Sequence, residues 1–195
     1  MGFMKEIVLA SASPRRSFLL KQIGLTFSVM PSHIKEKTDA NLEPGTMVEK
    51  LSYDKAYDIA EKLHKDCLVI GADTIVVKDG DILGKPRDEQ EAYKMLKYLQ
   101  GDWHEVFTGV TVIDAAYMRS FTDHVRTRVK MRSMPDEMIY SYISTKEPMD
   151  KAGAYGIQGM GALLVEAIDG CYFNVVGLPL MKLSDMLLKF GVKLL

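Results

Sequence analysis

A polar, glycine-rich segment in the last third of the chain joins groups that bind charged ligands to a backbone that can turn tightly. It covers residues 147–161 and reads EPMDKAGAYGIQGMG. Glu147 and Asp150 offer carboxylate oxygens, and Lys151 offers an ammonium group. Gln158 adds an amide that both donates and accepts hydrogen bonds. Since glycine loses much backbone entropy on folding, such a segment favours a binding loop over a core element. We interpret it as the wall of a site for a polar, charged small molecule.

A second group of polar residues follows the first apolar run of the chain. Ser11 lies just after that run, and Pro14 is positioned to open a helix. Helix N-termini attract anions, and Arg15 with Arg16 could each contact a phosphate through two N–H groups. The alternative is an ordinary helix start with two solvated arginines, and the segment alone leaves both interpretations open. The chain has no Walker A spacing, so a P-loop nucleoside triphosphatase is not supported.

Asp73 interrupts an apolar run, residues 68–77, that is typical of a central strand buried on both faces. A buried carboxylate is costly unless it is paired, hydrogen-bonded or bound to metal. Catalytic sites use such placements, which makes Asp73 a candidate catalytic group. The alternative is a structural aspartate satisfied by a neighbouring lysine or by backbone N–H groups. Thr74, the next residue, is the second polar interruption.

Several further charged residues are candidate ligands of phosphate or metal. Lys55 shares an i, i+4 row with apolar residues of an expected helix, so we expect it to face the protein body. Lys85 and Lys151 are further candidate phosphate ligands, although each alone is more typical of a surface lysine. Asp73 could bind Mg²⁺ or Mn²⁺ together with a set of other carboxylates. That tentative set is Glu36, Glu147 and Asp150.

Hydrophobic periodicity and turn residues predict an α/β protein with a mixed sheet. We expect strands at residues 7–10, 27–30, 68–77, 106–115, 119–130 and 162–168. We expect helices at 14–24, from 46 to about 63, at 88–99, at 135–144 and at 180–190. Thr46 and Glu49 have the spacing of a capping box, and Asp79-Gly80 indicates a hairpin.

Length and composition narrow the function classes. The chain has 195 residues, which favours one domain over residues 1–195. Its 25 basic and 26 acidic residues nearly cancel, so we expect neither nucleic acid nor a membrane surface as a partner. No apolar run approaches the roughly 20 residues of a membrane helix. The two cysteines lack metal-site spacing and no signal sequence opens the chain, so we expect a cytoplasmic protein.

Six short blocks, taken in order, resemble the Maf family of nucleotide pyrophosphatases. They are LASASPRR (9–16), GADT (71–74), GKP (84–86), TGV (108–110), EPMDKAGAYGIQG (147–159) and NVVGLPL (174–180). Each block alone is weak, but six in sequence cover nearly the whole chain.

The resemblance implies an elongated mixed β-sheet flanked by helices, with two lobes around a central cleft, as in inosine triphosphatases. It implies hydrolysis of a nucleoside triphosphate to the monophosphate and pyrophosphate with a divalent metal cation, Mg²⁺ or Mn²⁺. By motif, Asp73 matches the family's proton acceptor. Positions tied to substrate choice are matched by Arg15, Thr74 and Gln158, and pocket residues by Ser11, Arg16, Glu36, Lys55 and Lys85. A homodimer is also consistent with the resemblance.

Thr74 and Gln158 are similar to the family branch that acts on dTTP and UTP, whereas the branch acting on 7-methyl-GTP carries Glu in place of the glutamine. Modified pyrimidine nucleotides are further candidate substrates.

Two alternative functions stay open. A sugar nucleotidyltransferase would also begin with a strand, a turn and an arginine, but would need a glycine-rich turn where this chain has Ala12 and Ser13. A nucleotide-sensing regulator of cell division is the non-enzymatic alternative, because the family is associated with septum formation.

Overall fold

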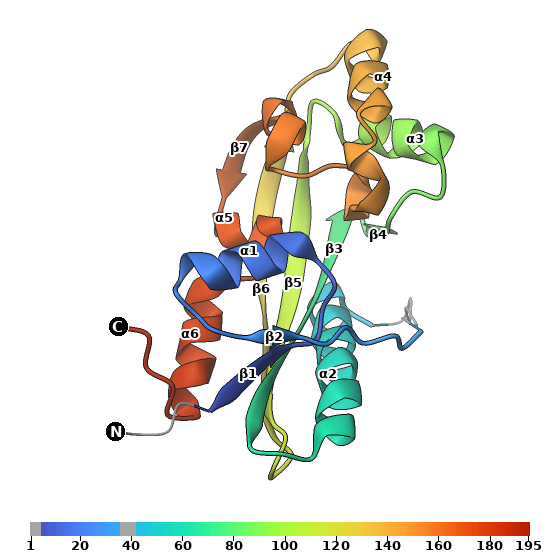
Figure 1. The fold of residues 1–195 in the computed structure, drawn as a ribbon. Helices are drawn as coiled ribbons and strands as arrows, with labels where there is room; N and C mark the ends of the chain where they lie inside the picture. Colours follow the sequence, from blue (N-terminus) through green and yellow to red (C-terminus); the bar gives the residue numbers. More distant parts are fainter. Residues whose placement is uncertain (1–4, 36–41) are drawn as a thin grey trace. The chain divides into compact units, whose positions relative to one another are not determined.

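The computed structural model describes residues 5–35 and 42–195, and its strands form one mixed sheet (Figure 1). The strand order is β2-β1-β3-β5-β6-β7, and β4 pairs with β3 outside this path. The strands are β1 (Glu6–Leu9), β2 (Ser28–Val29), β3 (Cys67–Lys78), β4 (Asp81–Leu83), β5 (Trp103–Asp114), β6 (Arg119–Met131) and β7 (Val165–Asp169). β1 is parallel to β2 and β3, while the β3–β4 and β6–β7 pairs are antiparallel. The predicted α/β class with a mixed sheet is therefore confirmed.

Helices account for most of the remaining described residues. The α-helices are α1 (Pro14–Gln22), α2 (Pro44–Leu63), α3 (Glu89–Leu99), α4 (Asp136–Ser144), α5 (Tyr172–Val176) and α6 (Leu180–Lys189). Three short 3₁₀-helices lie in the glycine-rich region: η1 (Glu147–Asp150), η2 (Ala152–Ala154) and η3 (Gly159–Leu164). The chain divides into two compact units.

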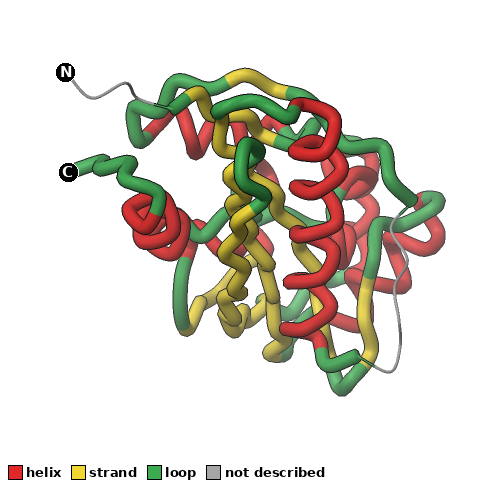
Figure 2. Tube along the Cα trace, turned by 90° about the horizontal axis from the view of Figure 1, so that it is seen from below, coloured by secondary structure: helices red, strands yellow, loops and turns green. Residues whose placement is uncertain are grey.

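The first unit comprises Met1–Asp73, Thr108–Val125 and Gly177–Leu195. Helices α2 and α6 lie on opposite sides of its strands (Figure 2). One of its cores joins the apolar face of α2, including Ala56 and Ile59, to strand residues such as Val8 and Val69. Burial of such a face supplies most of the stability of an amphipathic helix.

Two glycines let α2 lie directly on these strands. A Cβ atom at Gly71 of β3 would collide with the Ser52 carbonyl oxygen, and one at Gly109 of β5 would collide with the Val48 carbonyl oxygen. Any larger residue would therefore push the helix backbone away from the sheet. The glycines of the GADT and TGV blocks thus set the distance between α2 and the sheet.

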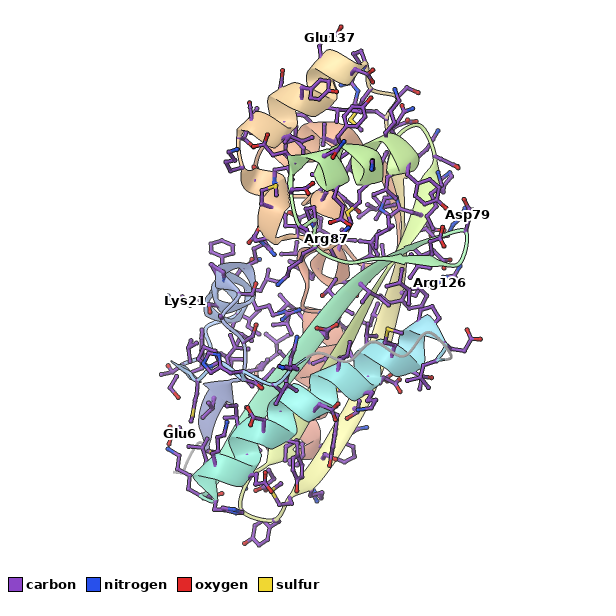
Figure 3. The ribbon with its side chains drawn as sticks, turned by 90° about the vertical axis from the view of Figure 1, so that its right-hand side faces the viewer. Glu6, Lys21, Asp79, Arg87, Arg126 and Glu137 are labelled. Atoms are coloured by element: carbon purple, nitrogen blue, oxygen red, sulfur yellow. The ribbon has the colours of Figure 1, made fainter. Side chains whose placement is uncertain are left out.

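The second unit comprises Thr74–Phe107 and Arg126–Val176. Helices α3 and α4 pack against one another, and η1 and η2 contact them (Figure 1). Its core includes Leu96 of α3, Ile139 of α4 and Val129 of β6. Figure 3 shows Asp79 at the tip of the β3–β4 hairpin, where Asp79 and Gly80 have positive φ angles, as the predicted turn requires.

Most predicted elements are present, with three corrections. The predicted capping box is wrong, because α2 begins at Pro44 and Thr46 lies inside its first turn. The last strand begins at Val165 and not at residue 162, since residues 159–164 form η3. β5 begins at Trp103, three residues before the predicted start. The short elements β4 and α5 were not predicted.

Candidate functional site

The Ser11–Arg16 segment is organised by hydrogen bonds to the arginine. Arg16 donates from Nη1 to Ser11 Oγ at 3.0 Å and from Nε to the Gly177 carbonyl oxygen at 2.8 Å. Ser11 is buried, and its Oγ also accepts from the Ser13 backbone N–H. Arg16 therefore joins two sequence blocks 161 residues apart and has a fixed position at the start of α1. Arg15, its neighbour, is half-buried.

Asp73 and Lys55 form an ion pair inside the first unit. The Lys55 Nζ lies 2.5 Å from Asp73 Oδ1, and the two side chains are only 13% and 9% exposed. Lys55 reaches the carboxylate from α2, as its position on the apolar stripe predicted, while Asp73 lies on the central strand β3. An ammonium group at this distance favours the ionised carboxylate, which is the form that accepts a proton.

Thr74 and Lys85 belong to the second unit, and their roles stay predictions. Thr74 follows Asp73 on β3 and is half-buried. Lys85 is exposed on the segment between β4 and α3. Glu36 lies outside the residues that the structure describes.

The glycine-rich loop of the second unit is organised around Glu147. Glu147 Oε1 accepts hydrogen bonds from the Gly161 N–H and the Tyr142 hydroxyl, both at 3.0 Å, and Oε2 accepts from the Met160 N–H at 3.0 Å. Burial alone would raise the pKa of Glu147, but these three donors hold that pKa below its usual value. The carboxylate is therefore ionised and directed at its own loop.

Lys151 and Asp150 belong to the same loop. Lys151 Nζ donates to the Glu147 carbonyl oxygen at 2.5 Å and to Asp150 Oδ1 at 2.7 Å. The loop is also linked to the GKP block, since the Gly153 N–H donates to the Gly84 carbonyl oxygen at 3.0 Å. Gln158 is half-buried and directly precedes η3.

The described members of the predicted metal set all have other partners. Asp73 pairs with Lys55, Asp150 pairs with Lys151, and Glu147 binds the backbone of its loop. Each of these carboxylates has a partner within its own unit, and their sharing of a cation stays a prediction. Within the described residues, metal-ligand atoms come within 4.8 Å of one another at Glu49, Asp123 and His124. None of these three belongs to the predicted set.

A comparison with protein families confirms the resemblance of the sequence blocks. A profile described as Maf-like protein matches residues 6–190. The chain belongs to the Maf family. A curated relative from Acetivibrio thermocellus, named dTTP/UTP pyrophosphatase, is 56% identical over 198 residues that cover 98% of each chain. A relative of the same name from Pelotomaculum thermopropionicum is 53% identical over 192 residues, covering 98% of this chain and all of that one.

Among solved structures, this Maf-family chain is similar to a HAM1 protein from Coxiella burnetii. The TM-score is 0.49 at 15% identity, and the match covers 68% of this chain and 75% of that one. None of the helices at residues 5–35 and 42–195 combines the length and the apolar character that crossing a membrane requires.

Sequence reasoning missed two polar residues that shape the second unit. Tyr142 is buried and accepts from the Gly156 N–H while donating to Glu147, so it links two points of the loop. Asn174 is fully buried and donates to the Val106 carbonyl oxygen and to Thr127 Oγ1. The NVVG block contains Asn174, and a polar residue between apolar neighbours was the available signal.

Proposed function

We propose that this Maf-family protein hydrolyses dTTP and UTP to the monophosphate and pyrophosphate, as a housecleaning enzyme of the nucleotide pool. The observation that carries this proposal is the identity of more than half of all residues, over nearly the full length of both chains, with relatives named dTTP/UTP pyrophosphatase. The buried Lys55–Asp73 pair adds a chemical group suited to such a reaction. Modified pyrimidine nucleotides are additional candidate substrates.

In this proposal Asp73 is the general base. It removes a proton from a water molecule that attacks the α-phosphorus, and pyrophosphate leaves. The ammonium of Lys55, 2.5 Å away, keeps the carboxylate ionised before the reaction and balances charge in the site.

The other pocket residues have simpler proposed roles. Arg15 and Arg16 neutralise phosphate charge, and Ser11, Lys85 and Glu36 are further proposed contacts of the nucleotide. The amide of Gln158 and the hydroxyl of Thr74 select the base, because the edge of uracil or thymine offers carbonyl acceptors and the N3 donor. A base that left this half-buried amide without partners would bind less well.

A divalent cation, Mg²⁺ or Mn²⁺, belongs to the proposed reaction as the counter-ion of the triphosphate. It would neutralise charge that develops on the phosphate oxygens. Because Asp73, Glu147 and Asp150 are engaged by donors of the protein, we propose that the cation enters with the nucleotide.

We further propose a cytoplasmic protein with one Maf-like domain over residues 1–195, a homodimeric assembly, and neither nucleic acid nor membrane as a partner.

The deciding test is release of pyrophosphate from a panel of standard and modified nucleoside triphosphates with Mg²⁺ or Mn²⁺. We expect turnover of dTTP and UTP, and a decrease of about 10²- to 10⁴-fold in kcat for Asp73→Asn with nucleotide binding retained. Running the reaction in ¹⁸O-water should place the label in the monophosphate. A wild-type protein that binds these nucleotides without hydrolysing them would instead favour a sensor of nucleotide levels.

A further inference from the structure

The carboxylate of Glu147 is surrounded by donors from the loop that carries Gln158. Its three hydrogen bonds come from Met160, Gly161 and Tyr142. Met160 and Gly161 lie two and three residues after Gln158 in the sequence. The Glu147 side chain is therefore attached to the segment immediately beside the proposed base-selecting amide.

Two glycines of the loop lie close to this contact. Gly159, the residue after Gln158, has φ +64°, and a Cβ atom there would lie 2.6 Å from Glu147 Oε2. A Cβ atom at Gly161 would lie 2.7 Å from the Tyr142 hydroxyl and would collide with the Gly156 carbonyl oxygen. The backbone on the C-terminal side of Gln158 thus approaches the carboxylate as closely as an unsubstituted chain allows.

The other side of Gln158 is connected to the same carboxylate through Tyr142. The Tyr142 hydroxyl accepts from the Gly156 N–H at 3.3 Å and donates to Glu147 Oε1 at 3.0 Å. A Cβ atom at Gly156 would lie 2.9 Å from the Lys151 side chain, whose ammonium contacts the Glu147 carbonyl oxygen. Backbone on both sides of Gln158 is therefore hydrogen-bonded to the Glu147 carboxylate, directly at Met160 and Gly161 and through the Tyr142 hydroxyl at Gly156.

We propose that Glu147 is a positioning residue that sets base selectivity, by holding residues 156–161 in the conformation that presents the Gln158 amide to a pyrimidine. This assignment rests on the proposed hydrolysis of dTTP and UTP. It replaces the metal-binding role that the residue type alone suggested, because all three contacts that organise the carboxylate come from the protein. Loss of a positioning residue should change the selectivity for the base, whereas loss of a metal ligand should change the Mg²⁺ concentration that the enzyme requires.

The main test is a double-mutant cycle of Glu147→Gln and Gln158→Ala. The glutamine retains one acceptor oxygen for Gly161 and Tyr142 but presents an NH₂ group to the Met160 N–H. We expect Glu147→Gln to lower the ratio of kcat/KM for UTP to that for CTP by about tenfold, mainly through KM, because base recognition is lost equally from the ground state and the transition state. In the Gln158→Ala background, the same change should lower the ratio no further.

Two companion variants keep the test decisive. Tyr142→Phe removes one donor to the same carboxylate and should shift the ratio in the same direction by a smaller factor, even if Glu147→Gln folds poorly. Glu137→Gln changes a carboxylate on α4 that is remote from the loop in Figure 3, and should leave the ratio unchanged. The Mg²⁺ concentration for half-maximal rate should be the same in the wild type and in Glu147→Gln.

The outcomes separate this inference from the proposed function. An active wild type in which the two substitutions lower the ratio independently, or in which Glu147→Gln raises the Mg²⁺ requirement, would overturn the positioning role only. A wild type that hydrolyses neither dTTP nor UTP would overturn the proposed function and the role of Glu147 with it.

Discussion

Charged side chains in the candidate site are stabilised by partners that the sequence does not reveal. Lys55 and Asp73 were each predicted to face the protein interior, from a helical stripe and from an apolar strand. The distance of 2.5 Å between Lys55 Nζ and Asp73 Oδ1 depends on how α2 lies on β3. Hydrophobic periodicity does not specify that packing. The same limit explains Glu147, whose residue type suggested a metal ligand although its actual partners are backbone donors of the loop.

The buried position of the Lys55–Asp73 pair gives a prediction about stability. Replacing Lys55 with Met should lower the free energy of unfolding by about 3 kcal/mol, because a buried carboxylate loses its ammonium partner. Urea unfolding monitored by circular dichroism would measure the change. Adding Asp73→Asn to Lys55→Met should restore part of the loss, since the uncompensated charge is then removed.

Lys50 on the same helix is a matched control. Its ammonium pairs with Asp54 at 2.5 Å, but the two side chains are 56% and 35% exposed. Lys50→Met should therefore change the free energy of unfolding by less than about 0.5 kcal/mol. Equal losses for Lys50→Met and Lys55→Met would contradict the importance of burial at the Lys55–Asp73 pair.

The position of helix α2 depends on the absence of side chains at two strand positions. Gly71 and Gly109 lie on β3 and β5, where the helix carbonyl groups of Ser52 and Val48 approach the sheet. Because Lys55 lies on this helix, the same contact determines whether its ammonium reaches Asp73. The two glycines belong to the GADT and TGV blocks, and the close packing is a physical reason for glycine at those positions.

Gly109→Ala should lower the free energy of unfolding by about 3 kcal/mol, the upper part of the range for overpacking, because the new methyl group would meet helix backbone. Turnover should fall as well if α2 shifts. Gly84→Ala provides the comparison, since a Cβ atom there has no neighbour within 4 Å. Thermal unfolding of both variants would measure the difference in stability. Unchanged stability of Gly109→Ala would show that the helix moves to accommodate the methyl group without losing stability.

Long elements with strong periodicity were predictable, and short elements were not. The apolar run of β3 and the amphipathic pattern of α6 gave nearly correct bounds. The start of α2 was misplaced because Thr46-x-x-Glu49 has the spacing of a cap, while Pro44 opens the helix earlier. Residues 162–164 were predicted to begin the last strand, but tertiary hydrogen bonds to Glu147 and the positive φ angle of Gly159 produce η3 over residues 159–164.

For the molecule as a whole, a buried histidine links stability to pH. His104 is 2% exposed, its Nε2 lies 2.6 Å from the Tyr155 hydroxyl, and its Nδ1 has no hydrogen-bond partner among the described residues. Burial, with a smaller contribution from the Lys78 ammonium, lowers the pKa of His104 to about 4. The folded protein therefore binds this proton less readily than the unfolded chain, in which the ordinary value of 6.5 applies.

The sign of this effect gives a further prediction. The contribution of neutral His104 to the free energy of unfolding is fully present above pH 6.5. About 3 kcal/mol of this stability is lost as the pH falls from 6.5 to 4. A double variant, His104→Phe with Tyr155→Phe, removes the titrating group and its partner together. Urea unfolding at pH 7 and pH 4.5 should show a smaller difference for the double variant than for the wild type. Identical differences would mean that His104 is not neutral in the folded protein.

The division of the chain into two units also has a consequence for biosynthesis. The first unit takes its residues from three separate stretches, and the last of these, Gly177–Leu195, contains α6. The second unit is complete once Val176 has been made. Because α6 follows the other described helices in sequence, it is the last of them to leave the ribosome. The first unit, which contains Asp73, can therefore complete its fold only after all residues of the second unit have emerged.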